Sequence, residues 1–79
     1  MEEVKQKILN VLKKKKADVV ISEDTSVNLL DSGVIDSFDI VDLIGSLEDM
    51  FGIEVDGDDI VPENFESVDA IVKLVVKYF

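Results

Sequence analysis

The sequence predicts an all-α fold, a small bundle of four helices in which a long loop separates helices one and two and the third helix is short. Three separate stretches carry apolar residues at helical spacing, with polar residues between them. Residues that favour helix starts and ends stand at the borders of these stretches. With 79 residues and 47% hydrophobic content, the chain can bury one modest core, so we expect a single domain over residues 1–79.

The first helix is expected over roughly residues 2–16. Its apolar residues recur at helical spacing and are Val4, Ile8, Val11 and Leu12. Four lysines close it at positions 13–16, and cations are favoured at a helix C-terminus by the helix dipole. Binding of phosphate or of a membrane surface is the alternative role for these lysines. Because the run is short and the rest of the chain is acidic, we interpret it as a solvated helix end.

A long connection follows over residues 17–36. A loop of this length usually needs apolar packing of its own, which we expect from Val27, Leu29, Leu30 and Ile35. The β-branched run at residues 19–21 is a weaker candidate for a strand, and its only plausible partner is the segment 53–55. Because a two-stranded ribbon is marginal in water, we expect no sheet.

The second helix is expected from Ser37 to Phe51. Asp36 suits the N-cap, where its carboxylate accepts a hydrogen bond from a free N–H group of the first turn, and Gly52 suits the C-terminal cap. The residues expected to face the core are Ile40, Leu43, Ile44, Leu47 and Phe51. Gly33 allows a sharp turn before the helix, so we expect the Ser37 hydroxyl on an exposed corner.

The C-terminal part is expected to hold one short helix or turn and one longer helix. Pro62 suits a first helical position, and the apolar residues around it are Ile60, Val61 and Phe65. The final helix should cover roughly residues 68–78, capped by Ser67, with Val68, Ile71, Val72 and Val75 facing inward. The acidic cluster at residues 56–59 lacks the ligand order of an EF-hand loop, so we expect no metal site there.

The charge of the chain favours basic protein partners. Residues 1–16 hold six lysines and two acids, a charge of +4, whereas residues 17–79 hold sixteen acids and two lysines, a charge of −14. Such a surface repels nucleic acid, which we exclude as a partner, and it attracts basic proteins. No apolar run approaches the ~20 residues needed to cross a bilayer, and the first residues do not form a signal peptide. We expect a cytoplasmic monomer.

Ser37 is the candidate functional residue because it opens the second helix. The first turn of a helix has unpaired N–H donors and the positive end of the dipole, so a phosphodiester on this hydroxyl would be stabilised. The chain has no His and no Cys, which excludes Ser-His-Asp and Cys-His nucleophile sites, thiolate and imidazole metal sites, and disulfides. A serine without a base is a weak nucleophile. We therefore expect a non-enzymatic substrate or carrier, modified at Ser37 by another protein.

Several segments match those of a known family. The tripeptide Asp36-Ser37-Phe38 stands where that family has Asp-Ser-Leu or Asp-Ser-Met, and the segments 29–33 and 51–55 match as well. Together with the length, the acidity and the order of elements, these matches make the sequence resemble the acyl carrier proteins and the related peptidyl and D-alanyl carrier proteins. The resemblance covers nearly the whole chain and implies the acyl-carrier type of four-helix bundle.

The resemblance also implies a cofactor and partners. A phosphopantetheinyl transferase would move 4′-phosphopantetheine from coenzyme A onto Ser37, next to Asp36, and acyl groups would be carried as thioesters on the thiol of this covalent arm. In the family, the second helix is recognised by basic acyl- or aminoacyl-transferring enzymes. By position, this role falls to Asp39, Val41, Asp42, Gly45, Glu48 and Asp49. Phe38 and Gly45 depart from the family pattern, in which Leu or Met and a larger apolar residue are common.

Three interpretations of function follow. The strongly acidic second helix favours a carrier of acyl groups in fatty-acid or polyketide-type biosynthesis. The segment 63–67 before the last helix is similar to that of D-alanyl and other aminoacyl carriers, which is the first alternative. The second alternative is an acidic helical interaction module without a prosthetic group, in which Ser37 is only a helix cap.

Overall fold

The computed structural model describes residues 2–15 and 26–79. These residues contain no strand, and they form three α-helices and two 3₁₀ turns: α1 (Glu2–Lys15), α2 (Ser37–Phe51), η1 (Gly57–Asp59), η2 (Pro62–Asn64) and α3 (Val68–Lys77). The predicted all-α class is confirmed. Where the sequence predicted a short third helix or turn, the structure has the single turn η2, with Pro62 at its first position. Lys16 and the run at residues 19–21 lie outside the described residues.

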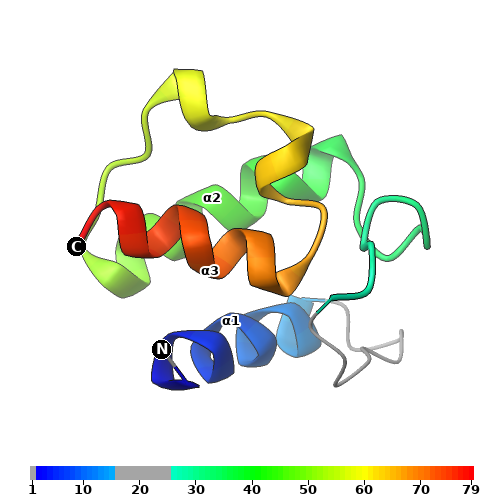
Figure 1. Ribbon diagram of the computed structural model, residues 1–79, viewed down its shortest axis with the longest axis horizontal. Coiled ribbons are helices and arrows are strands. Elements are labelled where there is room, and N and C mark those ends of the chain that lie inside the picture. The colour runs from blue at the N-terminus through cyan, green and yellow to red at the C-terminus, as the bar shows by residue number, and fades with distance from the viewer. Residues whose placement is uncertain (1, 16–25) are drawn as a thin grey trace.

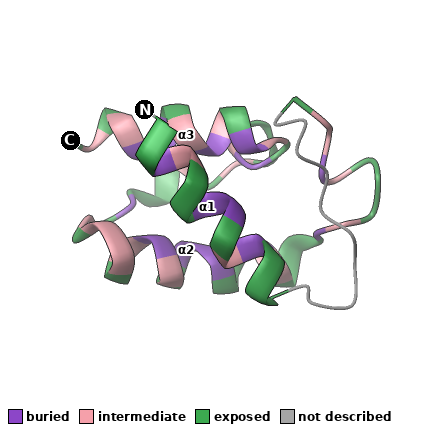
Figure 2. Cartoon of the chain, turned by 90° about the horizontal axis from the view of Figure 1, so that it is seen from below, coloured by how far each residue is buried: buried purple, intermediate pink, exposed green. Residues whose placement is uncertain are grey.

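The three α-helices pack around a common centre (Figure 1). Helices α2 and α3 run in the same direction, and α1 contacts both of them. The segment that carries η1 and η2 leaves the end of α2, passes over the top of the molecule in Figure 1 and returns to the start of α3. The buried positions of α1, α2 and α3 face the space between the helices (Figure 2).

Most of the predicted core positions are buried. In α2 they are Ile40, Leu43, Ile44 and Leu47, and the predicted residue Phe51 is half-buried against the same core. In the other two helices, the buried predicted residues are Val4, Ile8, Leu12, Val68, Ile71 and Val75, and Val11 and Val72 are half-buried. The periodicity therefore gave the correct face of every α-helix.

Two buried residues of the α-helices were missed by the sequence analysis. Leu9 and Leu74 are buried, although each lies beside the stripe that the periodicity selected. Because α1 contacts both α2 and α3, its buried face is wider than a single stripe, and Leu9 fills the added width. Phe65, directly after η2, is fully buried and fixes this turn to the core.

The loop before α2 is held in place by hydrogen bonds within the loop and by one to the segment before α3. The side-chain oxygen of Asn28 accepts hydrogen bonds from the N–H groups of Leu30 (3.0 Å) and Asp31 (2.9 Å). The N–H of Leu29 donates to the carbonyl of Glu66 (2.6 Å), and the Leu29 side chain is buried. Gly33 follows with φ of 80°, a left-handed conformation that glycine adopts without strain. These contacts fix the point at which α2 begins.

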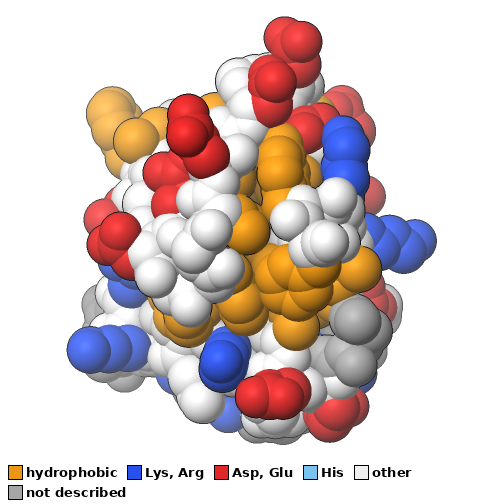
Figure 3. All heavy atoms as spheres, turned by 90° about the vertical axis from the view of Figure 1, so that its left-hand side faces the viewer, with side chains coloured by type: hydrophobic (Ala, Val, Ile, Leu, Met, Phe, Trp, Pro, Cys, Tyr) orange, Lys and Arg blue, Asp and Glu red, His pale blue; other side chains and the backbone are white. Residues whose placement is uncertain are grey.

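The opposite end of α2 belongs to a surface with exposed hydrophobic side chains (Figure 3). The exposed ring of Phe79 packs against Phe51, with the ring centroids 5.9 Å apart and the planes tilted by 55°. The Nζ atom of Lys7 lies 5.8 Å from the centroid of Phe51, within the range of a cation–π contact. Through these contacts, Phe51 at the C-terminal end of α2 connects Phe79 with the first half of α1.

Candidate functional site

The start of α2 is a capping box. The N–H of Asp39 donates to the carboxylate of Asp36 (3.0 Å), and the N–H of Asp36 donates to the carboxylate of Asp39 (3.0 Å). Asp36 has the extended backbone of an N-cap, as the sequence predicted. This arrangement makes Ser37 the first residue of the helix, and the side chain of Ser37 is exposed, as expected.

Ser37 lines an apolar pocket of about 240 Å³. The pocket lies between α2 and the stretch that leads into η2, and its other lining residues are Ile40, Val41, Ile60, Val61 and Pro62. A group attached to the Ser37 hydroxyl therefore starts at the edge of an apolar surface. The sequence analysis did not include residues 60–62 in the site; the available signal was an apolar run within an otherwise acidic segment.

Large hydrophobic side chains are exposed around the serine. Phe38 is 84% exposed, Val41 is 68% exposed and Ile60 is 41% exposed. Among the described residues, the Ser37 hydroxyl forms no hydrogen bond with a side chain. The exposed Ser37 is thus flanked by exposed apolar side chains, which are typical of a surface that contacts another molecule.

The predicted docking residues of α2 divide into two groups. Val41, Asp42, Gly45 and Asp49 are exposed and share one face of the helix, together with Phe38. We call these five residues the docking face, after the role that the sequence predicts for four of them. Within it, Asp42 is ion-paired with Lys15 of α1, with 2.8 Å between Nζ and Oδ2. Gly45 leaves the middle of this face without a side chain.

The other two predicted docking residues form internal contacts. The carboxylate of Asp39 belongs to the capping box. The carboxylate of Glu48 accepts a hydrogen bond from the N–H of Val55 (2.9 Å), which fixes the turn after α2. The structure therefore does not gather all the acidic residues of α2 on one free surface, and these two carboxylates also stabilise the helix ends.

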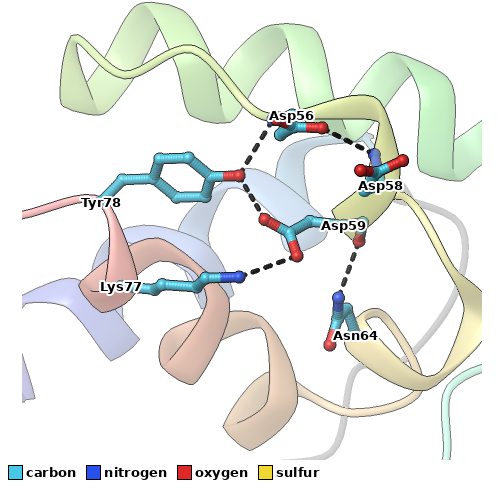
Figure 4. Close-up of polar contacts among 6 residues, drawn as sticks. All are labelled: Asp56, Asp58, Asp59, Asn64, Lys77 and Tyr78. Atoms are coloured by element: carbon cyan, nitrogen blue, oxygen red, sulfur yellow. Dashed lines mark hydrogen bonds and ion pairs between the residues drawn. The ribbon is translucent and has the colours of Figure 1, made fainter.

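A polar cluster at the end of α3 was not identified from the sequence (Figure 4). The Tyr78 hydroxyl donates a hydrogen bond to the carboxylate of Asp59 and accepts one from the N–H of Asp56 (2.9 Å). The Nζ atom of Lys77 lies 2.9 Å from the same carboxylate. We call Asp56, Asp59, Lys77 and Tyr78 the C-terminal latch. It fastens η1, the turn just before the pocket residues 60–62, to the end of α3.

The C-terminal latch shifts the pKa values of its members. Hydrogen bonds from Lys77 and then Tyr78 hold the pKa of Asp59 below its ordinary value of 3.8. The hydrogen bond to Asp59 raises the pKa of Lys77, and the hydrogen bond to Asp59 also raises the pKa of Tyr78. These directions mean that the charged carboxylate, the charged amine and the neutral phenol are the forms that the fold favours.

Two further features concern residues 2–15 and 26–79. No group of three or more acidic side chains in these ranges is arranged to hold a metal ion. No helix among them is long and apolar enough to cross a bilayer.

Comparison with known proteins identifies relatives over almost the whole chain. A family model described as "Phosphopantetheine attachment site" matches residues 2–75. Curated proteins named D-alanyl carrier protein from Bacillus cereus (strain B4264), Bacillus cereus (strain ATCC 10987 / NRS 248) and Bacillus anthracis (strain CDC 684 / NRRL 3495) are each 26% identical over 73 residues. These alignments cover 92% of this chain and 92% of each relative. No solved structure gives a significant match.

Proposed function

Because the chain belongs to the phosphopantetheine attachment-site family, whose members are non-catalytic carriers with covalently attached 4′-phosphopantetheine, we propose that Ser37 is its attachment residue. The observation that carries this proposal is the position of Ser37: an exposed hydroxyl in the first turn of α2, directly after the N-cap residue Asp36. The free N–H groups and the dipole of that turn favour a phosphodiester. The arm, once attached, supplies a thiol on which cargo is held as a thioester.

Asp36 has a supporting role in this proposal. Its carboxylate is engaged with the N–H of Asp39, so the first turn of α2 is formed before any partner arrives. The residues around Ser37 also fit an arm. The hydroxyl of Ser37 is accessible and lies beside the apolar pocket, of which Ile40 and Val41 form one wall. No rearrangement of the described residues is needed to expose the attachment atom.

The partners that we propose are a phosphopantetheinyl transferase and basic enzymes that load or unload cargo. Phe38 and Val41 offer exposed apolar contacts next to Ser37, and the acidic residues of the docking face favour a basic surface. The net charge of −10 also opposes self-association and nucleic-acid binding. We propose a single carrier domain over residues 1–79 that works as a cytoplasmic monomer.

The cargo that we propose is an acyl group of fatty-acid or polyketide-type biosynthesis. The apolar lining of the pocket beside Ser37 supports this choice, because an alkyl chain gains from burial at roughly 0.8 kcal/mol per buried methylene. D-alanine is the second candidate, and the names of the 26% identical relatives support it. A small charged amino acid would not need the pocket.

Mass spectrometry tests the attachment site. The purified chain is incubated with coenzyme A and a broad-specificity phosphopantetheinyl transferase. We expect a mass gain of one phosphopantetheinyl group on the parent chain and none on Ser37→Ala, while Ser32→Ala, an exposed serine in the preceding loop, still gains it. No gain on the parent, or the same gain on Ser37→Ala, overturns the proposal and favours the interaction module without a prosthetic group.

Thermal denaturation of loaded chains tests the cargo. Holo chains carrying octanoyl or D-alanyl thioesters are compared with the unloaded holo chain. If the pocket takes an alkyl chain, the octanoyl form melts at a higher temperature than the other two, because the ligand is bound by the folded state only. Equal melting temperatures for the octanoyl and D-alanyl forms contradict the acyl proposal.

Reversal of one charge tests the docking face. Asp49 is exposed on this face, and the structure gives it no internal contact among the described residues. We expect Asp49→Lys to slow modification by the transferase a few-fold, and added salt to reduce this difference, because both act on charge steering. Asp69→Lys makes the same change of charge on α3 and serves as the control. Equal rates for the two variants exclude Asp49 from the docking face.

A further inference from the structure

Residues 60–62 form the wall of the pocket opposite α2 and make few contacts that would hold them there. Val61 is half-buried, and Ile60 and Pro62 are exposed. The N–H of Ile60 donates only within η1, to the carbonyl of Gly57 (3.1 Å). Burial of these three side chains therefore contributes little to the position of the wall. Neighbouring residues must hold the segment against α2.

The C-terminal latch adjoins residues 60–62 at their N-terminal end. Asp59 directly precedes Ile60, and the side chain of Asp59 is only 18% exposed because Tyr78 and Lys77 cover its carboxylate. The carbonyl of Asp59 also accepts a hydrogen bond from the side-chain amide of Asn64 (2.7 Å), which draws the two 3₁₀ turns together around residues 60–62 (Figure 4). On the other side, the buried ring of Phe65 ends the segment. The wall is thus a short segment that is fixed at Asp59 on one side and at Phe65 on the other.

We propose that Tyr78 and Asp59 are positioning residues that hold residues 60–62 against α2 and thereby set the opening of the pocket beside Ser37. Tyr78 acts from the second-last position of the sequence, and it touches neither Ser37 nor the pocket. The consequence for cargo rests on the proposed function: with the latch closed, an alkyl chain attached through the arm is covered by Ile60 and Val61. With the latch open, the same chain is exposed to water.

Amide hydrogen exchange on the unmodified chain tests the positioning itself. Tyr78→Phe removes one hydroxyl and keeps the ring. We expect exchange at the N–H groups of Ile60 and Asn64 to become about tenfold faster, since a hydrogen bond to a charged group is lost, while the N–H of Leu47 in the core of α2 keeps its rate. Asp59→Asn is a second variant for the same result. Unchanged exchange at Ile60, or an equal increase at Leu47, overturns the proposal.

A matched pair of lysine variants gives the control for α3. Lys77→Met removes the ion pair of the latch. Lys73→Met, one turn earlier in α3, removes an exposed lysine that forms no hydrogen bond or ion pair with another described residue. We expect faster exchange at Ile60 in the first variant only. Faster exchange in both variants would mean that the charge of α3, and not the latch, holds the wall.

Thioester hydrolysis on the holo chain tests the consequence for cargo. Hydroxide attacks the thioester carbonyl, the carbon–sulfur bond breaks, and a carboxylate and the thiol of the arm are released. We expect the octanoyl thioester to be hydrolysed several-fold faster on Tyr78→Phe than on the parent. Acetyl thioesters should be hydrolysed at equal rates on both, because an acetyl group is too short to be covered by Ile60 and Val61. Equal octanoyl rates overturn the cargo consequence. If the parent chain gains no phosphopantetheine, the proposed function fails, and the exchange experiment still decides whether the latch holds the wall.

Discussion

The start of α2 and the end of α3 are both organised by aspartates, but the two regions are built on different length scales. The capping box joins Asp36 and Asp39, which are three residues apart. The C-terminal latch joins Tyr78 to Asp59 and Asp56, which are 19 and 22 residues away. The first region forms with the helix itself, whereas the second requires α3 and the preceding segment to pack first. The start of α2 is therefore encoded locally, whereas the wall of the pocket depends on tertiary structure.

Deletion of core volume should damage both regions at once and gives the largest effect. Leu47 is fully buried in α2. We expect Leu47→Ala to lower the free energy of unfolding by about 2–5 kcal/mol, because it leaves a cavity in a core with little stability in reserve. Asp49→Ala, two residues later on the exposed face, should change it by less than about 0.5 kcal/mol. Urea denaturation measures both, and a parent-like stability of Leu47→Ala would contradict its place in the core.

Removal of the cap should affect the start of α2 and spare the latch. We expect Asp36→Ala to lower the free energy of unfolding by about 1 kcal/mol, since one N–H group of the first turn loses its acceptor. Asp36→Asn keeps an acceptor and should remain within a few tenths of a kcal/mol of the parent. Hydrogen exchange at Ile60 should not change in either variant. Faster exchange there would show that the two regions are coupled.

Acid should weaken the C-terminal latch, with a smaller effect than the substitutions at Leu47 and Asp36. Phe65, which fixes the other end of the wall, has no titratable group and should be unaffected. The pKa of Asp59 is lowered in the folded state, so the stability that it contributes is complete above the ordinary value of 3.8 and is lost as the pH falls through the lower, folded value. The melting temperatures of the parent and Asp59→Asn should therefore converge below pH 3.8 and differ near neutrality. A constant difference across this range would show that the charge of Asp59 is irrelevant.

Alkali acts on the same latch through Tyr78 and Lys77. The pKa values of Tyr78 and Lys77 are raised in the folded state, so their contribution is complete below the ordinary values of 10.0 and 10.5 and is lost as the pH rises through the folded values. Tyr78→Phe should therefore lose the part of the alkaline transition that belongs to the phenol. Ultraviolet titration of the single tyrosine measures its pKa directly, and a value at or below 10.0 would contradict the hydrogen bond to Asp59.

The features that could be predicted from the sequence are those that depend on near neighbours. The cap at Asp36, the left-handed cap at Gly52 and the cap at Ser67 were all identified correctly, because each depends on residues within one turn. The buried stripe of α2 followed from periodicity in the same way. The position of Ser37 in an exposed first turn therefore needed no tertiary information.

The features that were missed depend on tertiary contacts. The ion pair between Lys15 and Asp42 spans 27 residues, and the pocket joins α2 to residues 60–62. Nothing in the local pattern distinguishes Asp59, which Tyr78 and Lys77 cover, from Asp58, which is exposed. Likewise, Glu48 was expected on the partner surface, and its contact with the N–H of Val55 follows only from the path of the chain after Gly52.

Gly45 gives the docking face a property that no other residue type would allow. A Cβ atom built at this position meets nothing within 4 Å, so alanine would fit the free chain without strain. Alanine would also favour the helix by about 1 kcal/mol. The chain therefore gives up helix stability at Gly45 and retains bare backbone at the centre of the face that we propose for docking. If the proposed docking holds, a partner's side chain can approach the peptide groups at Gly45 more closely than it could at any residue with a Cβ atom.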